Sequence, residues 1–338
     1  MAKTLLSALT IAAAPLAFLG STGAQAQANH HQHHATPELK HSAHVSHANI
    51  SPAAQRQIAQ VARAIEKYKD FSVAQDEGWR KFGDDEPLMG EHWYPPEQLG
   101  WEEYLGPDAR LDFARPSNLM YTDIDGEKVL TGVAFIARLA DGEDVPEGFS
   151  GSADRWHVHD FVRAINAATE ERPLLRWLAN WWLDANYFSK GDDRGRLAMV
   201  HVWASLPNPD GPFADHNRLL PYMKLGLPVG YANGASVDAA LGLNLATTGG
   251  CDAAAGGKLW IANAKRSQER AIKNACRTAA QQVSAALRDH REHPAMLNEA
   301  AEQAWRSFDA VWNRTLTPVQ RERVAAISEH GDGAHGGH

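Results

Sequence analysis

Histidine is the residue type through which this chain could carry out chemistry, and it occurs 17 times among 338 residues. One pair stands out, His157 and His159 in the run Trp-His-Val-His-Asp. Residues two apart on a β-strand project from the same face and lie about 7 Å apart, so both imidazoles can reach one ion. This spacing predicts a metal site on a strand.

Two more histidines lie beside aromatic residues, His92 in Met-Gly-Glu-His-Trp-Tyr and His201 in Met-Val-His-Val-Trp. We expect them to complete a site whose ligands are His92, His157, His159 and His201. Imidazole ligands suit zinc, copper, iron and nickel, and copper or zinc is the expected ion. Taken singly, each histidine is better explained as a half-buried residue with one hydrogen bond, and only the four together favour a metal. The polar neighbours that could orient these ligands are Glu91, Asp160, Asp215 and His216.

The first 28 residues have the features of a secretory signal peptide. Lys3 precedes an apolar run from Leu5 to Leu19, and two overlapping Ala-x-Ala sites follow, which allow cleavage after Ala26 or Ala28. The apolar run is shorter than the about 20 residues that span a bilayer. We therefore expect a periplasmic or secreted protein without a transmembrane span.

Cleavage after Ala28 would create a second metal site at the new N-terminus. The mature chain would begin Asn29-His30-His31. The α-amine, the amides of His30 and His31 and the His31 imidazole then offer four nitrogens in a plane, which suits copper(II) or nickel(II) and not zinc. The alternative cleavage places no histidine third. Weaker, exchangeable sites are expected at His33 and His34.

Composition and motifs argue against several other classes of function. The net charge is −8 and no basic stripe is present, which argues against a nucleic-acid partner. The sequence holds no Gly-x-Ser-x-Gly elbow, no phosphate-binding loop and no His-Glu-x-x-His motif. Its two cysteines, Cys251 and Cys276, predict a disulfide in an oxidising compartment, with a thiolate metal site as the alternative.

The order of local signals predicts an α+β fold with an antiparallel sheet and flanking helices, followed by a C-terminal helical segment. A first helix should begin after Ser51 as N-cap. Another should begin after Thr169 as its cap, with Pro173 in its first turn and an apolar face of leucines and tryptophans. Strands are expected at 119–124 and 128–136, joined by an Asp-Gly turn, and at 155–161 and 197–204. Later helices are expected at 262–290 and 295–314 and from Pro318.

These signals divide the chain into six expected segments. They are a signal peptide 1–28, a disordered His-rich tract 29–50, an α+β core domain 51–225, a Gly-rich loop 226–260, a helical segment 261–329 and a His/Gly tail 330–338.

Over roughly residues 55–217, the chain resembles a family of secreted bacterial proteins of unknown function. The shared features are an early helix leading to Gly78-Trp79, a Met-Gly-x-His-aromatic motif at 89–93, and a His-Val-Trp motif at 201–203 that leads to Asn-Pro-x-Gly-x-Phe at 208–213. The resemblance implies that His92 and His201 belong to the site. It supplies no activity, and the chain departs from the pattern at 156–160, in an inserted helix and in its long C-terminal extension.

Three hypotheses of function follow. The leading one is an exported metal-binding protein that handles copper or zinc through a folded histidine site and His-rich tails. The second is a metalloenzyme in which the same histidines leave an open position for water or substrate. The third is a structural or partner-binding protein without a metal. No substrate can be named, and an enzyme is the less favoured interpretation.

Overall fold

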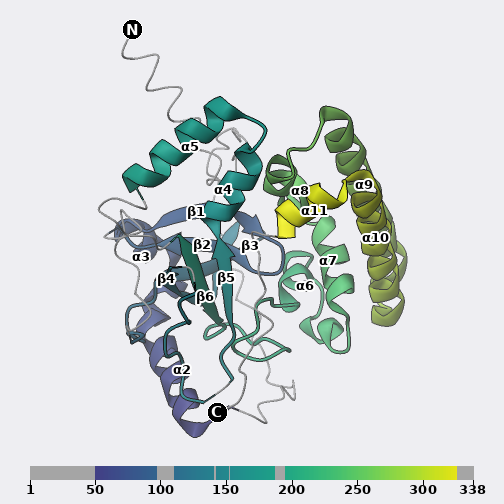
Figure 1. Cartoon of the computed structure of the whole chain (residues 1–338). Helices are drawn as coiled ribbons and strands as arrows, with labels where there is room; N and C mark the ends of the chain where they lie inside the picture. Colours follow the sequence, from purple (N-terminus) through teal and green to yellow (C-terminus); the bar gives the residue numbers. More distant parts are fainter. Residues whose placement is uncertain (1–49, 97–109, 141, 152, 187–194, 326–338) are drawn as a thin grey trace.

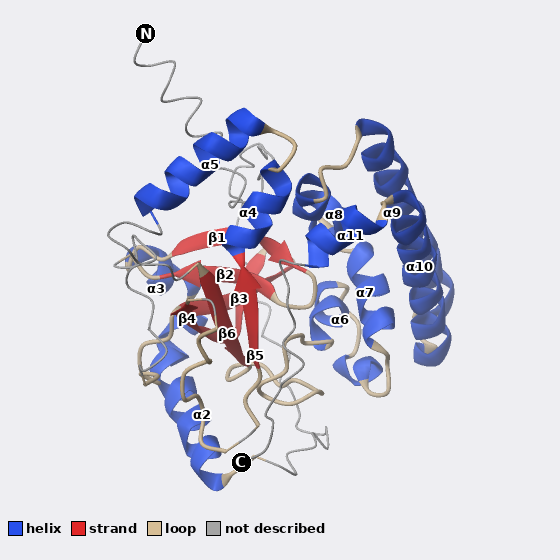
Figure 2. Cartoon of the chain, viewed as in Figure 1, coloured by secondary structure: helices blue, strands red, loops and turns tan. Residues whose placement is uncertain are grey.

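The structure is a computed structural model that describes residues 50–96, 110–140, 142–151, 153–186 and 195–325. A central antiparallel sheet has helices packed around it, and a group of C-terminal helices lies beside it (Figures 1 and 2). The predicted α+β class is confirmed. The expected signal peptide, His-rich tract and His/Gly tail lie outside the described residues. Among the helices that the structure describes, none is long and apolar enough to cross a membrane.

Within the described residues, six strands form one sheet in the order β1-β2-β3-β4-β6-β5, and every neighbouring pair is antiparallel. The four expected strands are β3 to β6, and β1 and β2 are additional. Asp125 and Gly126 join β3 to β4 with φ of 53° and 85°, as a tight two-residue hairpin requires. The strands are β1 Arg80–Glu86, β2 Gly90–Tyr94, β3 Asn118–Ile124, β4 Glu127–Leu139, β5 Trp156–Asp160 and β6 Arg196–Val202.

A β-bulge shapes the middle of the sheet. Strand β4 has one residue more than β3 at this point, Thr131, whose Oγ1 donates a hydrogen bond to a β3 carbonyl at 3.1 Å. Leu130 and Val133 therefore face the same core although they are three residues apart. A bulge increases the local twist of a sheet, and this one lies between the strands that carry His92 and His201.

The N-terminal helices cover one face of the sheet. They are α2 Pro52–Ile65, η1 Glu66–Lys69 and α3 Phe71–Asp76. Ser51 caps α2 as predicted, because its Oγ accepts a hydrogen bond from Ala54 N at 3.0 Å. Val61 and Ile65 then pack against buried residues of β3, β4 and β6, which fixes this face as an apolar core.

The C-terminal helices form a second core that begins before residue 225. They are α6 Leu219–Lys224, η3 Val229–Ala232, α7 Val237–Leu245, α8 Gly250–Ile261, α9 Arg266–His290, α10 Pro294–Thr315 and α11 Pro318–Ala325. Helices α9, α10 and α11 confirm the helices predicted at 262–290, at 295–314 and from Pro318. The Gly-rich loop expected at 226–260 was wrong, since most of that segment is helical. Gly242 there allows close packing: a Cβ would lie 2.0 Å from the carbonyl oxygen of Ala301 in α10.

Helices α4 (Phe161–Thr169) and α5 (Pro173–Asn186) lie at one end of the sheet (Figure 1). The expected capping role of Thr169 was wrong, because its Oγ1 donates a hydrogen bond to Ile165 O within α4 at 2.7 Å. The apolar face expected on α5 is largely exposed, with Leu174 at 71% and Trp177 at 63%. Over the described side chains of α5, the leucines and tryptophans of this face are therefore not packed into the core that the sequence pattern predicted.

The predicted disulfide is confirmed between Cys251 in α8 and Cys276 in α9, whose Cα atoms lie 5.7 Å apart. Cys276 is fully buried. The bond closes a loop with a sequence separation of 25, which in the chain-entropy model stabilises the fold by roughly 3 kcal/mol.

We predict that protein unfolded without reductant gives almost no signal in a free-thiol assay. Replacing both cysteines by serine should then lower the free energy of unfolding by roughly 3 kcal/mol, since the unfolded chain regains its loop entropy. Denaturant titration measures this difference. Detection of two reactive thiols per chain would contradict the prediction.

Gly132 in β4 allows the chain leaving β6 to cross closely over the sheet. A Cβ at this position would lie 2.3 Å from Val202 O and 3.0 Å from Trp203 Cα. We predict that Gly132→Ala lowers the free energy of unfolding by about 1–3 kcal/mol, the usual cost of overpacking. Gly256→Ala in α8 is the matched control, because no atom lies within 4 Å of its added Cβ. Equal unfolding midpoints for the two variants would show that the crossing is not tight.

Candidate metal centre

The register of the strands places four histidines on one face of the sheet. His92 lies on β2, His201 on β6, and His157 and His159 on β5. On β5 the alternation of side chains keeps His157 and His159 together, and their ring centroids are 4.9 Å apart. The face on which they lie is the one opposite α2.

His92 and His201 meet although two strands separate β2 from β6. Their Nε2 atoms are 3.2 Å apart, whereas three strand spacings on a flat sheet would separate the two positions by about 14 Å. The residues between them on this face are Met120, Gly132 and Ala134. The sheet must therefore curve over these mostly small residues, and the bulge at Thr131 adds the twist that this requires.

His157 completes a compact group of three imidazoles. Its ring centroid lies 4.9 Å from that of His201, and the centroids of His92 and His201 are 5.3 Å apart. All three side chains are buried, with 7%, 4% and 0% of His92, His157 and His201 exposed. His159 adjoins His157 at the less buried side of the group.

The hydrogen bond of His201 Nδ1 fixes its tautomer. This nitrogen lies 2.8 Å from the carbonyl oxygen of Asp215. A carbonyl only accepts hydrogen bonds, so Nδ1 carries the proton, and in the neutral ring Nε2 carries the lone pair. That lone pair is directed toward His92, which is the orientation of a metal ligand.

Asp215 also faces His157. Its Oδ1 lies 3.3 Å from His157 Nδ1. Neither ring nitrogen of His157 makes a hydrogen bond within the part of the chain that the structure describes. A carboxylate beside one imidazole nitrogen holds the ring so that the other nitrogen is available to an ion. One residue thus orients two candidate ligands, one through its backbone and one through its side chain.

The motif that follows β6 holds Asp215 in place. Trp203 Nε1 donates a hydrogen bond to Ala214 O at 2.6 Å, and Asn208 Nδ2 donates one to His216 O at 2.8 Å. The residues on either side of Asp215 are therefore both fixed by side chains of the His-Val-Trp and Asn-Pro-x-Gly-x-Phe motifs. Through these two hydrogen bonds, Trp203 and Asn208 position Asp215, and Asp215 in turn contacts the histidine rings.

Burial keeps two of the imidazoles neutral at physiological pH. Desolvation, with a smaller contribution from His157, lowers the pKa of His92 to about 4. Desolvation also lowers the pKa of His201 well below its ordinary value, helped by His157 and His92 and opposed by the hydrogen bond to Asp215. Metal ions bind neutral imidazole, so both rings are in the form that a ligand needs.

The geometry fits a pair of ligands more closely than a complete site. Two nitrogens bound to one tetrahedral ion at about 2.0–2.1 Å lie about 3.3 Å apart, close to the 3.2 Å between His92 and His201 Nε2. Over the described residues, however, no group of three or more His, Cys, Asp or Glu is arranged ready to hold a metal. His157 would have to turn for its Nε2 to become the third ligand.

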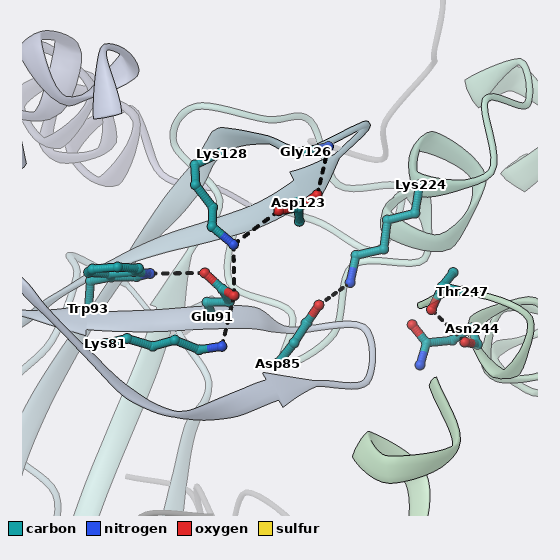
Figure 3. A network of polar contacts seen from close by, with 10 residues as sticks. All are labelled: Lys81, Asp85, Glu91, Trp93, Asp123, Gly126, Lys128, Lys224, Asn244 and Thr247. Atoms are coloured by element: carbon teal, nitrogen blue, oxygen red, sulfur yellow. Dashed lines mark hydrogen bonds and ion pairs between the residues drawn. The ribbon is translucent and has the colours of Figure 1, made fainter. Parts of the chain in front are cut away.

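Three of the residues expected to orient the ligands make other polar contacts. Glu91 points to the opposite face, where Lys81 and Lys128 contact its Oε1 at 2.8 and 2.9 Å (Figure 3). Burial raises the pKa of Glu91, but the two lysines outweigh this and lower it below its ordinary value. Asp160 caps α4 by accepting a hydrogen bond from Arg163 N at 2.8 Å.

His216, the third of these residues, contributes its carbonyl to the bond from Asn208 described above, and it also helps to lower the pKa of His201. The expected N-terminal site at residues 29–34 lies outside the described residues. Met199 was not among the expected site residues, although it precedes His201 by two positions, the same spacing that singles out His157 and His159.

Comparisons with protein-family models, with curated proteins and with solved structures gave no match. The residues and their geometry are therefore what is available for assigning a function to this chain.

The buried histidines predict a pH-dependent stability for the metal-free protein. The pKa of His92 is about 4 in the folded chain, against the ordinary value of 6.5. Below pH 6.5 a histidine of the unfolded chain binds a proton, whereas the buried histidine of the folded chain stays unprotonated until about pH 4. The free energy of unfolding therefore falls as pH falls, by up to about 1.4 kcal/mol per pH unit for each buried histidine. Above pH 6.5, this contribution is constant.

Urea unfolding with a chelator present, from about pH 7.5 to about pH 5, measures this slope before most carboxylates titrate. His201→Asn should reduce the slope. His293→Ala should leave it unchanged, because His293 is exposed. A free energy of unfolding that stays constant across this range would contradict the assignment of buried, neutral imidazoles.

Proposed function

We propose that this protein is exported and binds one transition metal ion, copper or zinc, through His92, His157 and His201. The observation that carries the proposal is the 3.2 Å approach of His92 Nε2 and His201 Nε2, with the His201 lone pair directed into the gap. An ion placed between these two nitrogens would replace a single hydrogen bond by two ligand bonds. His157 Nε2, buried and without a hydrogen bond among described residues, supplies the third.

Protonation and orientation both support binding. Ligands must be deprotonated before they bind, and burial has already made His92 and His201 neutral. Asp215 orients His201 through its carbonyl and faces His157 with its carboxylate. Such outer partners typically change metal affinity by 10–100-fold, so the loop that carries Asp215 is part of the proposed site.

Burial favours holding an ion over catalysis on it. A catalytic metal keeps an open position for water or substrate, whereas at most 7% of each of the three side chains is exposed. Export is supported by the disulfide between Cys251 and Cys276, a bond that is typical of oxidising compartments. The His-rich ends would then supply weaker, exchangeable sites around the folded one.

The test compares His201→Ala and His157→Ala with the matched control His293→Ala in the full chain. Zinc(II) and cobalt(II) are titrated against a competing chelator strong enough to remove ions from the His-rich ends. Loss of a ligand should weaken the folded site by more than about 100-fold, since loss of an orienting partner alone costs 10–100-fold. His293 is exposed, and its removal should change nothing.

A second measurement protects the test against misfolded variants. In the wild-type chain, one equivalent of zinc(II) should shift the imidazole proton signals of His92, His157 and His201 together. Tight binding that survives both His201→Ala and His157→Ala in folded variants would overturn the proposal. So would zinc that shifts only the signals of the His-rich ends.

A further inference from the structure

Two methionines lie directly across from candidate ligands on the same face of the sheet. Met120 on β3 pairs with His92, and Met199 on β6 pairs with His157. Side chains that are directly opposite in an antiparallel pair have Cβ atoms about 4.5–5.5 Å apart. Both thioethers therefore lie at the border of the imidazole group.

Only Met199 is placed between two of the histidines. It is opposite His157 and two residues before His201 on the same strand, so all three side chains project from one face. Met120 is fully buried among apolar side chains such as Trp203 and Leu220, whereas Met199 is only partly buried at the edge of that cluster. A methionine has three flexible side-chain torsions, which allow the Met199 sulfur to turn toward the ion.

The charges around the site favour a monovalent ion. Imidazole binds a metal ion in its neutral form and a thioether carries no charge, while the Asp215 carboxylate lies 3.3 Å from His157 Nδ1. The desolvation cost of a buried ion grows with the square of its charge, so a divalent ion costs about four times as much as a monovalent one. A single positive charge beside one carboxylate would leave the centre neutral.

The chemical softness of the ligands also favours a monovalent ion. Thioether sulfur is a soft ligand that selects copper(I), while zinc(II) is bound by imidazole, thiolate and carboxylate. Resting on the proposed metal site, we infer that the resident ion is copper(I) and that the Met199 sulfur is its fourth ligand, beside the Nε2 atoms of His92, His157 and His201. The protein is then a copper(I)-binding protein, and zinc is a surrogate that uses the histidines alone.

The experiment titrates the full chain with copper(I) under ascorbate against a chromogenic copper(I) chelator, and separately with zinc(II). Met199→Leu keeps the volume of the side chain and removes the sulfur. Met223→Leu is the matched control, because Met223 is partly buried against the same cluster and pairs with no histidine. Met199→Leu should weaken copper(I) by at least about 10-fold and leave zinc(II) within about 2-fold. Met223→Leu should leave both ions unchanged.

X-ray absorption of the wild-type chain with one equivalent of copper(I) gives an independent measurement. One sulfur should appear beside the nitrogen ligands, and it should vanish in Met199→Leu. Copper with nitrogen neighbours only, or equal copper(I) affinity in folded Met199→Leu, would overturn the inference and leave the histidine site standing. Failure of copper and zinc alike to depend on His201 would instead remove the proposed function itself.

Discussion

The close approach of His92 and His201 is the contact on which the rest of the site depends. Their strands are separated by β3 and β4, so the two rings can meet only if the sheet curves toward them. Gly132 and Ala134 supply the small side chains over which it curves, and the bulge at Thr131 supplies twist. On the opposite face, α2 packs its apolar residues against buried side chains of β3, β4 and β6.

Asp215 couples this curved sheet to the loop that follows it. Its carbonyl fixes His201 and its carboxylate faces His157, while Trp203 and Asn208 hold its two neighbours in the chain. The loop also bonds back to the turn between β1 and β2 through Asn217 N and Leu88 O at 2.8 Å. The strand that carries His92 and the loop that orients His157 and His201 are therefore parts of one hydrogen-bonded unit.

Local signals were enough to predict much of the fold, and non-local packing explains the failures. The cap at Ser51, the turn at Asp125 and the strand alternation at His157 depend on a few neighbouring residues, and each was predictable. The segment 226–260 was not, because its glycines indicated a loop, whereas Gly242 serves close packing of α7 on α10. That His92 and His201 lie together was expected from their motifs, whereas the strand order and curvature that bring them together are encoded by no spacing in the sequence.

Three imidazoles are an unfavourable choice for a core that has only to be stable. His157 Nε2 makes no hydrogen bond within the described structure, and an unsatisfied buried group costs about 1–3 kcal/mol. Apolar side chains of similar volume would avoid this cost. An ion that takes one lone pair from each ring would offset it in a single step, because it binds the folded arrangement and not the unfolded chain. Occupancy of the site and stability of the curved sheet are then one equilibrium, and the loop that carries Asp215 connects them.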